Sequence, residues 1–574
     1  MSADPGQIRE AWNAHWDDAL RAWSKLVRLS PPRWCMTEED EKREGLTGSF
    51  AQILLAEHAV ILSARQIAAL GLAPYPLEIM AHEVGHHVYC PGDLADAGRL
   101  VARVRRGLPG HELEAGMVSN LYEDILINDR LQRSAGLDSA AVWRVLRGDG
   151  ASTPLWALYT TIYEHLWSLP AGDLSGVKVD ARTDQDARLG ARLVRVYAKN
   201  WLRGGGRFAA LVLPYLQTDR PFADLAAAMD ATGQRTGVIP DGLTEIDDDE
   251  DDAVHPAFDP ELTGLSTDSP DPRTRSDGRS PRPRHRDLGE YGQLLATLGV
   301  RASSEDVASR YYRERALPYL VRYPTRRSPR ARELLPEGLE TWDPGSPLEQ
   351  IDWVESLARS PVVVPGLTTV ERVYGDSRGG DPERAPVDLY VGIDCSGSMP
   401  APRVLTSYPA LAGAIVSLSA LRVGASVKVV LSGEPNGRTL SMPDFLRDEA
   451  LVMQTLTSYL GTGIGFGVHR LAETFDAHEP RARPAHVLLL TDTDLYRLLD
   501  SVEDGKPGWD VARDALAAAR GGGTVVLNTA PAPQAPPVLR LRAGGWGVHF
   551  VSSWEALVDF AREFSRRAYE EERR

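Results

Sequence analysis

Cysteine is scarce in this 574-residue chain, which contains three: Cys35, Cys90 and Cys395. Three thiols cannot build a disulfide framework, so the sequence favours a reducing, cytoplasmic setting. Positive charge is also in short supply, because 64 lysines and arginines stand against 80 aspartates and glutamates and leave a net charge of −16. Binding to phosphates needs a positive surface, so we expect no nucleic acid as the main partner.

Long apolar runs are absent as well. No stretch approaches the length of a membrane span, so we expect no membrane partner. The N-terminal segment carries charges and tryptophans where a signal peptide would have an apolar stretch. What remains is an ordinary globular composition, with 43% hydrophobic and 25% charged residues, in a chain long enough for several domains.

Changes in composition predict four parts of a multidomain protein. Residues 1–240 are mainly helical in pattern, although the apolar segment 50–62 suits a strand as well as a buried helix. Residues 241–287 hold an acidic run and then an arginine- and proline-rich run, neither of which can bury a core, so they predict a flexible linker. Residues 288–384 form a helical and mixed intermediate region. Residues 385–574 form the last domain.

In this last domain, short apolar runs rich in β-branched residues alternate with helical segments. The runs read VDLYVGID, ASVKVVLS, AHVLLLTD, GGTVVLNT and WGVHFVS. Strands that alternate with helices form a parallel sheet covered on both faces. The sequence therefore predicts an α/β domain with a doubly wound, Rossmann-like parallel sheet.

The stretch MAHEVGHHVY contains an H-E-x-x-H motif made by His82, Glu83 and His86. On a helix, positions i and i+4 lie about 40° apart around the axis, so the two histidines project together. Two imidazoles on one face can take two corners of a zinc tetrahedron. Glu83 is then placed to accept a proton from the attacking water and pass it to a leaving amine. His87 points away from the pair, and we predict a surface or core role for it.

A catalytic zinc site needs a third protein ligand. The segment NLYEDILIND predicts a second helix on which Asn120, Asp124 and Asn128 form one polar stripe. This stripe favours Asp124 as the ligand, with the amides as its outer partners. Glu123 is the alternative, since it is longer and adjacent but lies off the stripe. Cys90 follows His86 by one turn, but the proline after it leaves its direction open.

The second cluster of candidate ligands begins at the end of the first predicted strand of the last domain. Asp394, Ser396 and Ser398 form an Asp-x-Ser-x-Ser loop, and the loops LGTGIG and LLLTDTD add Thr462 and Asp492. Carboxylate and hydroxyl oxygens are hard ligands that suit Mg²⁺, Mn²⁺ or Ca²⁺ rather than zinc. We expect the three loops to meet at the carboxyl edge of the parallel sheet, where open α/β folds bind ligands.

These three loops, in this order, closely resemble the metal-ion-dependent adhesion site of the von Willebrand factor A (VWA) domain. The resemblance covers residues 385–574. It implies that the loop residues hold a divalent cation such as Mg²⁺ and leave one coordination position for an Asp or Glu of a protein partner. The chain departs from the family at Thr493 and Asp494, where a glycine often follows the aspartate. The extra carboxylate there puts the preference for the ion in doubt.

The N-terminal part resembles predicted metal-dependent peptidases that carry a zincin-like domain and a C-terminal VWA-like domain. HEVGH, the NLYEDILIN stripe and the domain order carry this resemblance. It implies a zinc peptidase joined to a VWA domain that docks carboxylates, working beside a MoxR-type AAA+ ATPase. The alternative is a non-catalytic VWA adaptor whose peptidase-like domain is a metal-stabilised scaffold. The presence of Glu83 favours the enzyme, since a scaffold has no need for it.

Overall fold

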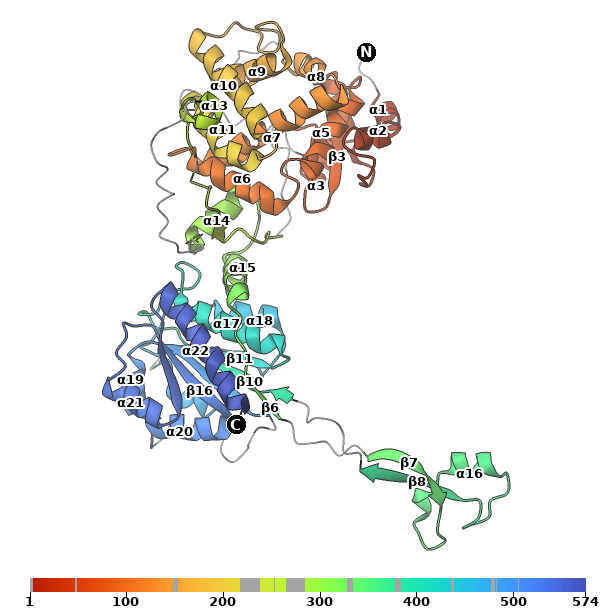
Figure 1. The fold of residues 1–574 in the computed structure, drawn as a ribbon, viewed down its shortest axis with the longest axis vertical. Helices are drawn as coiled ribbons and strands as arrows, with labels where there is room; N and C mark the ends of the chain where they lie inside the picture. Colours follow the sequence, from red (N-terminus) through yellow and green to blue (C-terminus); the bar gives the residue numbers. More distant parts are fainter. Residues whose placement is uncertain are drawn as a thin grey trace. The chain divides into compact units, whose positions relative to one another are not determined.

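The computed structural model describes residues 4–46, 49–147, 153–216, 238–251, 253–264, 284–327, 334–376, 384–434, 438–475, 481, 483–503 and 505–573. It divides into two compact units (Figure 1). The first unit is Met1–Arg315 with Pro402–Thr406, and the second is Ala316–Ala401 with Ser407–Arg574. In the described part of the chain, no helix combines the length and the apolar character needed to cross a membrane.

Helices dominate the first unit. Those that precede the H-E-x-x-H segment are α1 (Pro5–Asn13), α2 (Trp16–Arg21), α3 (Glu38–Glu44) and α4 (Ala64–Ala69). Those that follow are α5 (Pro76–Val88), α6 (Leu94–Arg106), α7 (Ala115–Arg130), α8 (Ser139–Leu146), α9 (Pro154–Trp167), α10 (Ala181–Tyr197), α11 (Trp201–Leu216), α13 (Pro260–Thr263), α14 (Leu288–Thr297) and α15 (Ser304–Ala316). The predicted helical character of this part is therefore present in the structure.

A small sheet lies beside these helices. Its strand order is β1 (Arg33–Cys35), β3 (Ala59–Ser63) and β2 (Ala51–Leu54), with β2 and β3 antiparallel. The apolar segment 50–62, which the sequence leaves open between strand and helix, is thus a β-hairpin. Its buried side chains join those of α1, α2 and α5 in one core that includes Trp12, Trp16, Ile53 and Met80.

The central helix of the first unit is α7, which packs against α5, α6, α9 and α11 and runs through the orange part of the ribbon in Figure 1. Because it has neighbours on every side, nearly all of its residues from Val118 to Asp129 are buried, charged ones included. A helix buried all round shows no polar face to solvent. Its carboxylates therefore lie inside the unit, where they need partners.

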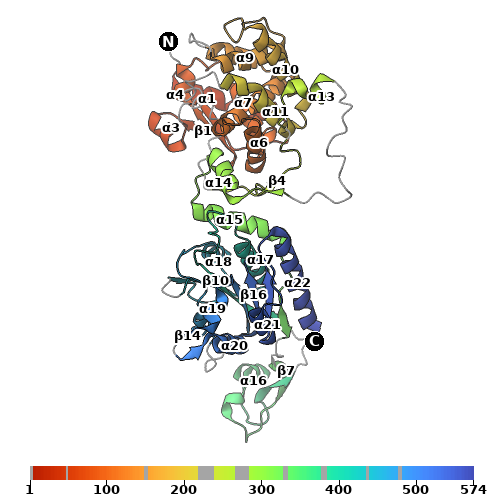
Figure 2. The same cartoon turned by 90° about the vertical axis from the view of Figure 1, so that its left-hand side faces the viewer.

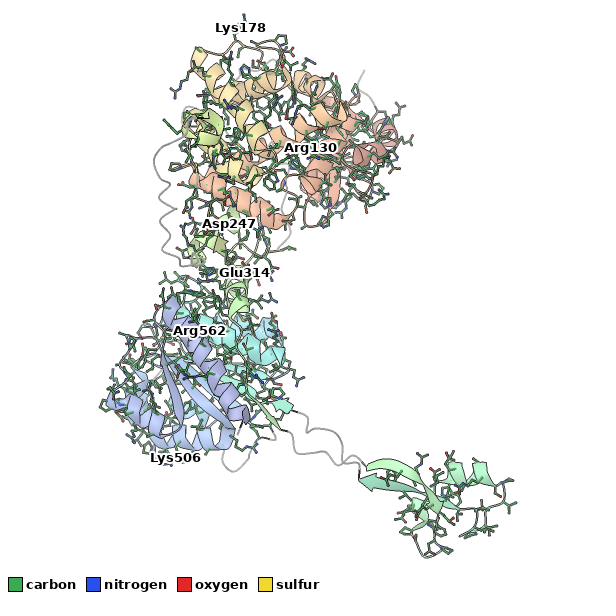
Figure 3. The ribbon with its side chains drawn as sticks, in the orientation of Figure 1. Arg130, Lys178, Asp247, Glu314, Lys506 and Arg562 are labelled. Carbon is green, nitrogen blue, oxygen red and sulfur yellow. The ribbon has the colours of Figure 1, made fainter. Side chains whose placement is uncertain are left out.

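The acidic run differs from the predicted flexible linker. Strand β4 (Glu245–Ile246) pairs with β5 (Arg284–His285), and the buried Arg286 forms an ion pair with the buried Glu250. The buried Arg103 of α6 contacts two further carboxylates of the run, including Asp247, which is labelled in Figure 3. Residues 241–251 and 284–287 are ordered because arginines distant in the sequence neutralise the run. Residues 265–283 of the predicted linker lie outside the described residues.

The predicted intermediate region is divided between the units. Helices α14 and α15 belong almost entirely to the first unit, whereas two antiparallel strand pairs belong to the second. One pair is β6 (Thr325–Arg327) with β9 (Arg384–Pro386). The other is β7 (Leu334–Thr341) with β8 (Val370–Asp376), between which lies α16 (Trp353–Arg359).

The second unit contains a six-stranded sheet of order β12-β11-β10-β13-β16-β17. Its strands are β10 (Asp388–Asp394), β11 (Val427–Ser432), β12 (Thr439–Ser441), β13 (Ala485–Thr491), β16 (Arg520–Leu527) and β17 (Trp546–Phe550). All neighbours are parallel except the edge pair β11 and β12. The five predicted strand runs are the five parallel strands, so the predicted α/β class is confirmed in this form, and the antiparallel edge strand is an addition.

Helices cover both faces of this sheet, whose strands run between them in Figures 1 and 2. They are α17 (Tyr408–Arg422), α18 (Glu449–Leu456), α19 (Leu495–Asp500), α20 (Gly508–Ala519), α21 (Pro536–Ala543) and α22 (Trp554–Arg573). In β13, Leu489 shares a core cluster with Val511 of α20. Its neighbour Leu490 packs against α17, where a Cβ atom added to Gly413 would lie 2.7 Å from the leucine side chain. Since both leucines are buried, the strand reads as a continuous apolar run rather than an alternating one.

Strand order reverses beside β10. From β10 the chain moves outward through β11 and β12, then returns to place β13 on the other side of β10. The carboxyl ends of β10 and β13 therefore flank a topological switch point, the place where open α/β sheets bind ligands. Asp394 ends β10, and Asp492 directly follows β13.

Two candidate metal sites

The first candidate site is built on α5. Pro76 opens this helix, and its apolar residues Ile79, Met80 and Val84 pack into the core of the first unit. A helical conformation over 76–88 places His82 and His86 one turn apart, as the H-E-x-x-H spacing predicts. The two rings are edge-to-face, with centroids 5.0 Å apart.

Gly85 lets α5 approach its neighbours closely. A Cβ atom at this position would lie 2.6 Å from the side chains of both Ile127 and Trp23. Trp23 also donates its indole N–H to the carbonyl oxygen of Ala81 at 2.7 Å. The glycine thus allows the close packing of α5 on α7, the helix that carries the other candidate ligands.

Asp124 of α7 contacts both histidines. Its Oδ1 atom lies 3.2 Å from Nε2 of His82 and 3.3 Å from Nε2 of His86. These three residues form a group whose ligand atoms are close enough together to hold a metal ion. Zinc–ligand distances of about 2.0–2.1 Å in a tetrahedron separate ligand atoms by about 3.3–3.4 Å. The two distances from Asp124 to the histidines agree with that edge.

Glu123, the alternative third ligand, occupies a different position. Its Oε2 atom lies 3.4 Å from Nδ1 of His86, on the side of the ring away from Asp124. A carboxylate on the outer nitrogen of a ligating histidine orients the ring and raises its basicity. Glu123 and Asp124 therefore contact opposite nitrogens of His86, and only Asp124 belongs to the group that could hold a metal ion.

Asn128 orients the other histidine. Its amide oxygen accepts a hydrogen bond of 2.9 Å from Nδ1 of His82, while Nε2 of the same ring faces Oδ1 of Asp124. The amide nitrogen of Asn128 in turn donates to the hydroxyl of Tyr163 on α9, and this hydroxyl lies 3.2 Å from that of Tyr159. Asn128 of the predicted polar stripe thus links His82 to α9. Asn120, the first residue of the stripe, is also buried.

Glu83 is enclosed in the same place. Its side chain is 3% exposed, and its Oε2 atom makes no hydrogen bond to any residue that the structure describes. Burial raises the pKa of this carboxyl to about 7, even though the two neighbouring histidines lower it. A buried carboxylate oxygen without a partner is costly, so its presence points to a group bound beside the histidines.

The charges of the first site are strongly coupled. Burial alone would lower the pKa of His86, but contacts with Asp124 and Glu123 outweigh it and raise that pKa to about 10. Burial opposes ionisation of Asp124 too, yet the two histidines hold its pKa at about 2. Without a metal ion the cluster therefore stores a proton on His86. Cys90 lies outside the three-residue group, and burial raises the pKa of its thiol well above the usual value.

The second candidate site lies at the switch point of the sheet. Asp394 accepts a backbone N–H from Ser396 at 2.8 Å, and the hydroxyls of Ser396 and Ser398 lie 3.0 Å apart. Ser398 then donates to Oδ2 of Asp492. Four of the five predicted ligands are thereby joined in one hydrogen-bonded chain across the carboxyl ends of β10 and β13.

The loop of Thr462, the fifth predicted ligand, lies against the loop that carries Asp394 and Ser396. Its backbone N–H donates to the carbonyl of Cys395 at 3.1 Å, while its hydroxyl accepts from the backbone of Arg438. Two glycines allow the close approach, since a Cβ on Gly433 would lie 1.9 Å from the carbonyl oxygen of Thr462. A Cβ on Gly463 would lie 1.9 Å from the carbonyl oxygen of Gly433. Backbones this close require glycine on both loops.

Two carboxylates meet at the second site with no cationic side chain between them in the contacts described. Burial raises the pKa of Asp394, the neighbouring charge of Asp492 raises it further, and hydrogen bonds from Ser396 and Thr491 offset only part of this. Asp394 is 2% exposed and Asp492 is 9% exposed. Two buried carboxylates surrounded by hydroxyls form a hard-oxygen donor set that a divalent cation would neutralise.

Thr493 and Asp494, the two residues that depart from the VWA pattern, directly follow Asp492. The N–H of Asp494 donates to Oδ1 of Asp492 at 2.8 Å, so the extra acidic residue holds the ligand by its backbone. Helix α19 begins at the next residue. Asp494 thus acts on Asp492 through its backbone N–H, a group that every residue except proline offers.

Some residues whose hydroxyls join the hydrogen bonds of the two sites could not be recognised from the sequence. Tyr163 and Tyr159 stand at helical spacing among apolar residues and read as core, although their hydroxyls extend the chain from Asn128. Thr491 reads as an ordinary strand residue, yet its hydroxyl donates to Oδ2 of Asp394 at 2.8 Å. In each case the residue type suits both roles, and only the contact between distant segments distinguishes them.

Comparison with known proteins gives no further identification. No protein-family model, no curated protein and no solved structure matches the chain. The assignment of function therefore depends on the chemistry of the two groups of residues described above.

Proposed function

We propose that the first unit is a zinc-dependent peptidase. The observation that carries this proposal is Glu83, a buried carboxylate with an unpartnered oxygen beside the group His82, His86 and Asp124. The three residues would hold zinc through two imidazole nitrogens and one carboxylate oxygen, as catalytic zinc sites do. A bound zinc ion would supply Lewis acidity to a peptide carbonyl and to water.

The protein's own groups would do the rest of the chemistry. Glu83 would take a proton from the attacking water and give it to the leaving amine, because a group with a pKa of about 7 can both accept and release a proton near neutral pH. Asn128 and Glu123 would hold the two imidazoles in the tautomers that leave Nε2 free. His82, whose side chain is 16% exposed, is the most exposed of the three candidate ligands. We therefore place the approach of substrate on its side.

Replacing Glu83 with glutamine tests the enzyme against the scaffold. Glu83→Gln keeps the shape of the side chain and removes the base, so we expect bound zinc and fold to be retained and peptide hydrolysis to fall about 10²–10⁴-fold. Zinc content and cleavage of a mixed peptide library by mass spectrometry are measured for both proteins, with His15→Ala as a surface control. Equal cleavage by Glu83→Gln and wild type would exclude this mechanism. No cleavage by either, with zinc retained, would favour the non-catalytic adaptor.

We further propose that the second unit docks a carboxylate of a protein partner through a divalent cation, as VWA domains do. The meeting of Asp394 and Asp492 at the switch point, with Ser396 and Ser398 between them, supports this proposal. Mg²⁺ suits this donor set, and Thr462 lies on the adjoining loop. The resemblance of the two parts extends the proposal to a MoxR-type AAA+ ATPase as partner.

Removing the charge of the loop tests the docking proposal. Asp394→Ala should abolish Mg²⁺ binding at this site, whereas Ser396→Ala should weaken it less, because water can replace a neutral hydroxyl. Mg²⁺ titration of the full-length protein is paired with capture of a purified MoxR-type ATPase, with and without EDTA. Capture that persists both in EDTA and in Asp394→Ala would show that docking occurs elsewhere.

A further inference from the structure

A second pair of histidines lies on the surface of the first unit. His58 sits in the turn between β2 and β3, and His87 is the residue before the last of α5. Their Nδ1 atoms are 3.2 Å apart, although the residues are 29 positions apart in the sequence. His58 is exposed and His87 is half-buried, so the pair is open to solvent.

The separation of the two nitrogens matches a metal chelate. Two nitrogens bound to a tetrahedral ion at about 2.0–2.1 Å lie about 3.3–3.4 Å from each other. Two N–H groups cannot face each other at 3.2 Å, so at least one ring presents a lone pair at Nδ1. The ring planes are inclined by 59°, which is not a stacked arrangement. When an ion displaces the proton shared by the two nitrogens, both Nδ1 lone pairs become available to it.

The backbone holds His58 in a conformation that few residues adopt. Its φ of 51° lies in the left-handed region, one of three such values for residues other than glycine in the described part of the chain. The turn thereby directs the imidazole at α5, where His87 meets it. Besides glycine, histidine and asparagine are among the few residues enriched in this conformation.

We propose that His58 and His87 form a second, exposed site for a divalent transition metal ion of the zinc class. Two imidazoles supply two ligands, and water completes the coordination. Imidazole nitrogen selects ions such as Zn²⁺, Ni²⁺ or Cu²⁺ over Mg²⁺ and Ca²⁺, which prefer oxygen. The site is separate from the group His82, His86 and Asp124, to which neither residue belongs. With two protein ligands in place of three, it binds more weakly than that group.

A bound ion would link the β2–β3 turn to the end of α5. That helix also carries His82 and His86. The bound ion would therefore fix the C-terminal end of α5, directly after these two histidines. Anything that binds the folded state alone stabilises it by mass action. Zinc above the amount needed for the inner group should therefore raise the melting temperature further.

Equilibrium dialysis of the full-length protein against zinc, in saturating Mg²⁺ to occupy the second unit, tests this site. Wild type should bind one tight and one weaker equivalent, and the melting temperature should rise with the weaker one. His58→Asn, which suits the left-handed turn, and His87→Gln should each weaken the second equivalent by at least about tenfold and leave the tight one unchanged. The exposed His15, changed to Ala, is the matched control.

The outcomes are distinguishable from a failure of the peptidase proposal. His86→Ala should remove the tight equivalent and leave the weaker one. If His58→Asn and His87→Gln bind both equivalents as wild type does, the pair is a hydrogen-bonded contact and the proposed site does not exist. Loss of the second equivalent in only one of the two variants would also overturn it, because the site needs both imidazoles.

Discussion

Asp124 and Glu123 are neighbours on α7, and their amide isosteres separate the effect of a ligand from that of an orienting group. Asp124 places one oxygen 3.2 Å and 3.3 Å from the two Nε2 atoms, whereas Glu123 contacts only the outer nitrogen of His86. Losing an outer partner lowers metal affinity about 10–100-fold. Glu123→Gln should therefore cost that much, and Asp124→Asn, which removes a direct charged ligand, should cost more than about 100-fold.

Competition with a fluorescent zinc chelator measures both affinities at one pH. Asp129→Asn is the matched control, because Asp129 is buried on the same helix but pairs with Arg133 at 2.8 Å and is absent from the metal group. It should leave zinc affinity unchanged. A greater loss in Glu123→Gln than in Asp124→Asn would reverse the two roles, and equal small losses in both would refute the site.

Two further predictions concern the same helix pair. Zinc binding at pH 7 should release protons, because the raised pKa of His86, about 10, keeps that ring charged until the ion displaces its proton, so affinity should rise with pH towards 10. Calorimetry in buffers of different ionisation enthalpy measures the release, and identical heats would contradict it. Gly85→Ala should lower the free energy of unfolding by about 1–3 kcal/mol, since its Cβ would meet Ile127 and Trp23 at 2.6 Å. Urea denaturation checks this, and an unchanged midpoint would show that the helices can move apart.

Much of the second unit was predictable from local pattern. Each of its five parallel strands is an apolar run bounded by turn residues, and strands separated by helices pair in parallel. Asp394 and Asp492 stand where these runs end, so topology alone brings them to one edge. The antiparallel strand β12 was missed because its three residues, Thr439–Ser441, are all exposed and show no apolar pattern.

The first unit was predictable only in part. The spacing of His82 and His86 predicted their shared face, and the polar stripe on α7 favoured Asp124 over Glu123. The acidic run shows the limit of composition. By composition alone, the acidic run resembles a solvated linker. In the structure its Asp247 is bound by Arg103, which lies 144 residues away in the sequence. No local signal in the sequence shows such a pairing, because it depends on how α6 packs.

The position of β10 between β11 and β13 has a consequence for synthesis. A growing chain makes β10, β11 and β12 first, and Asp492 arrives only after β13, which pairs with the other edge of β10. An unfinished copy would display the whole Asp-x-Ser-x-Ser loop and still lack Asp492, which lies 94 residues beyond Ser398. Under the docking function proposed above, nascent or truncated copies would hold the cation with one carboxylate fewer and would compete less well than mature ones for a partner.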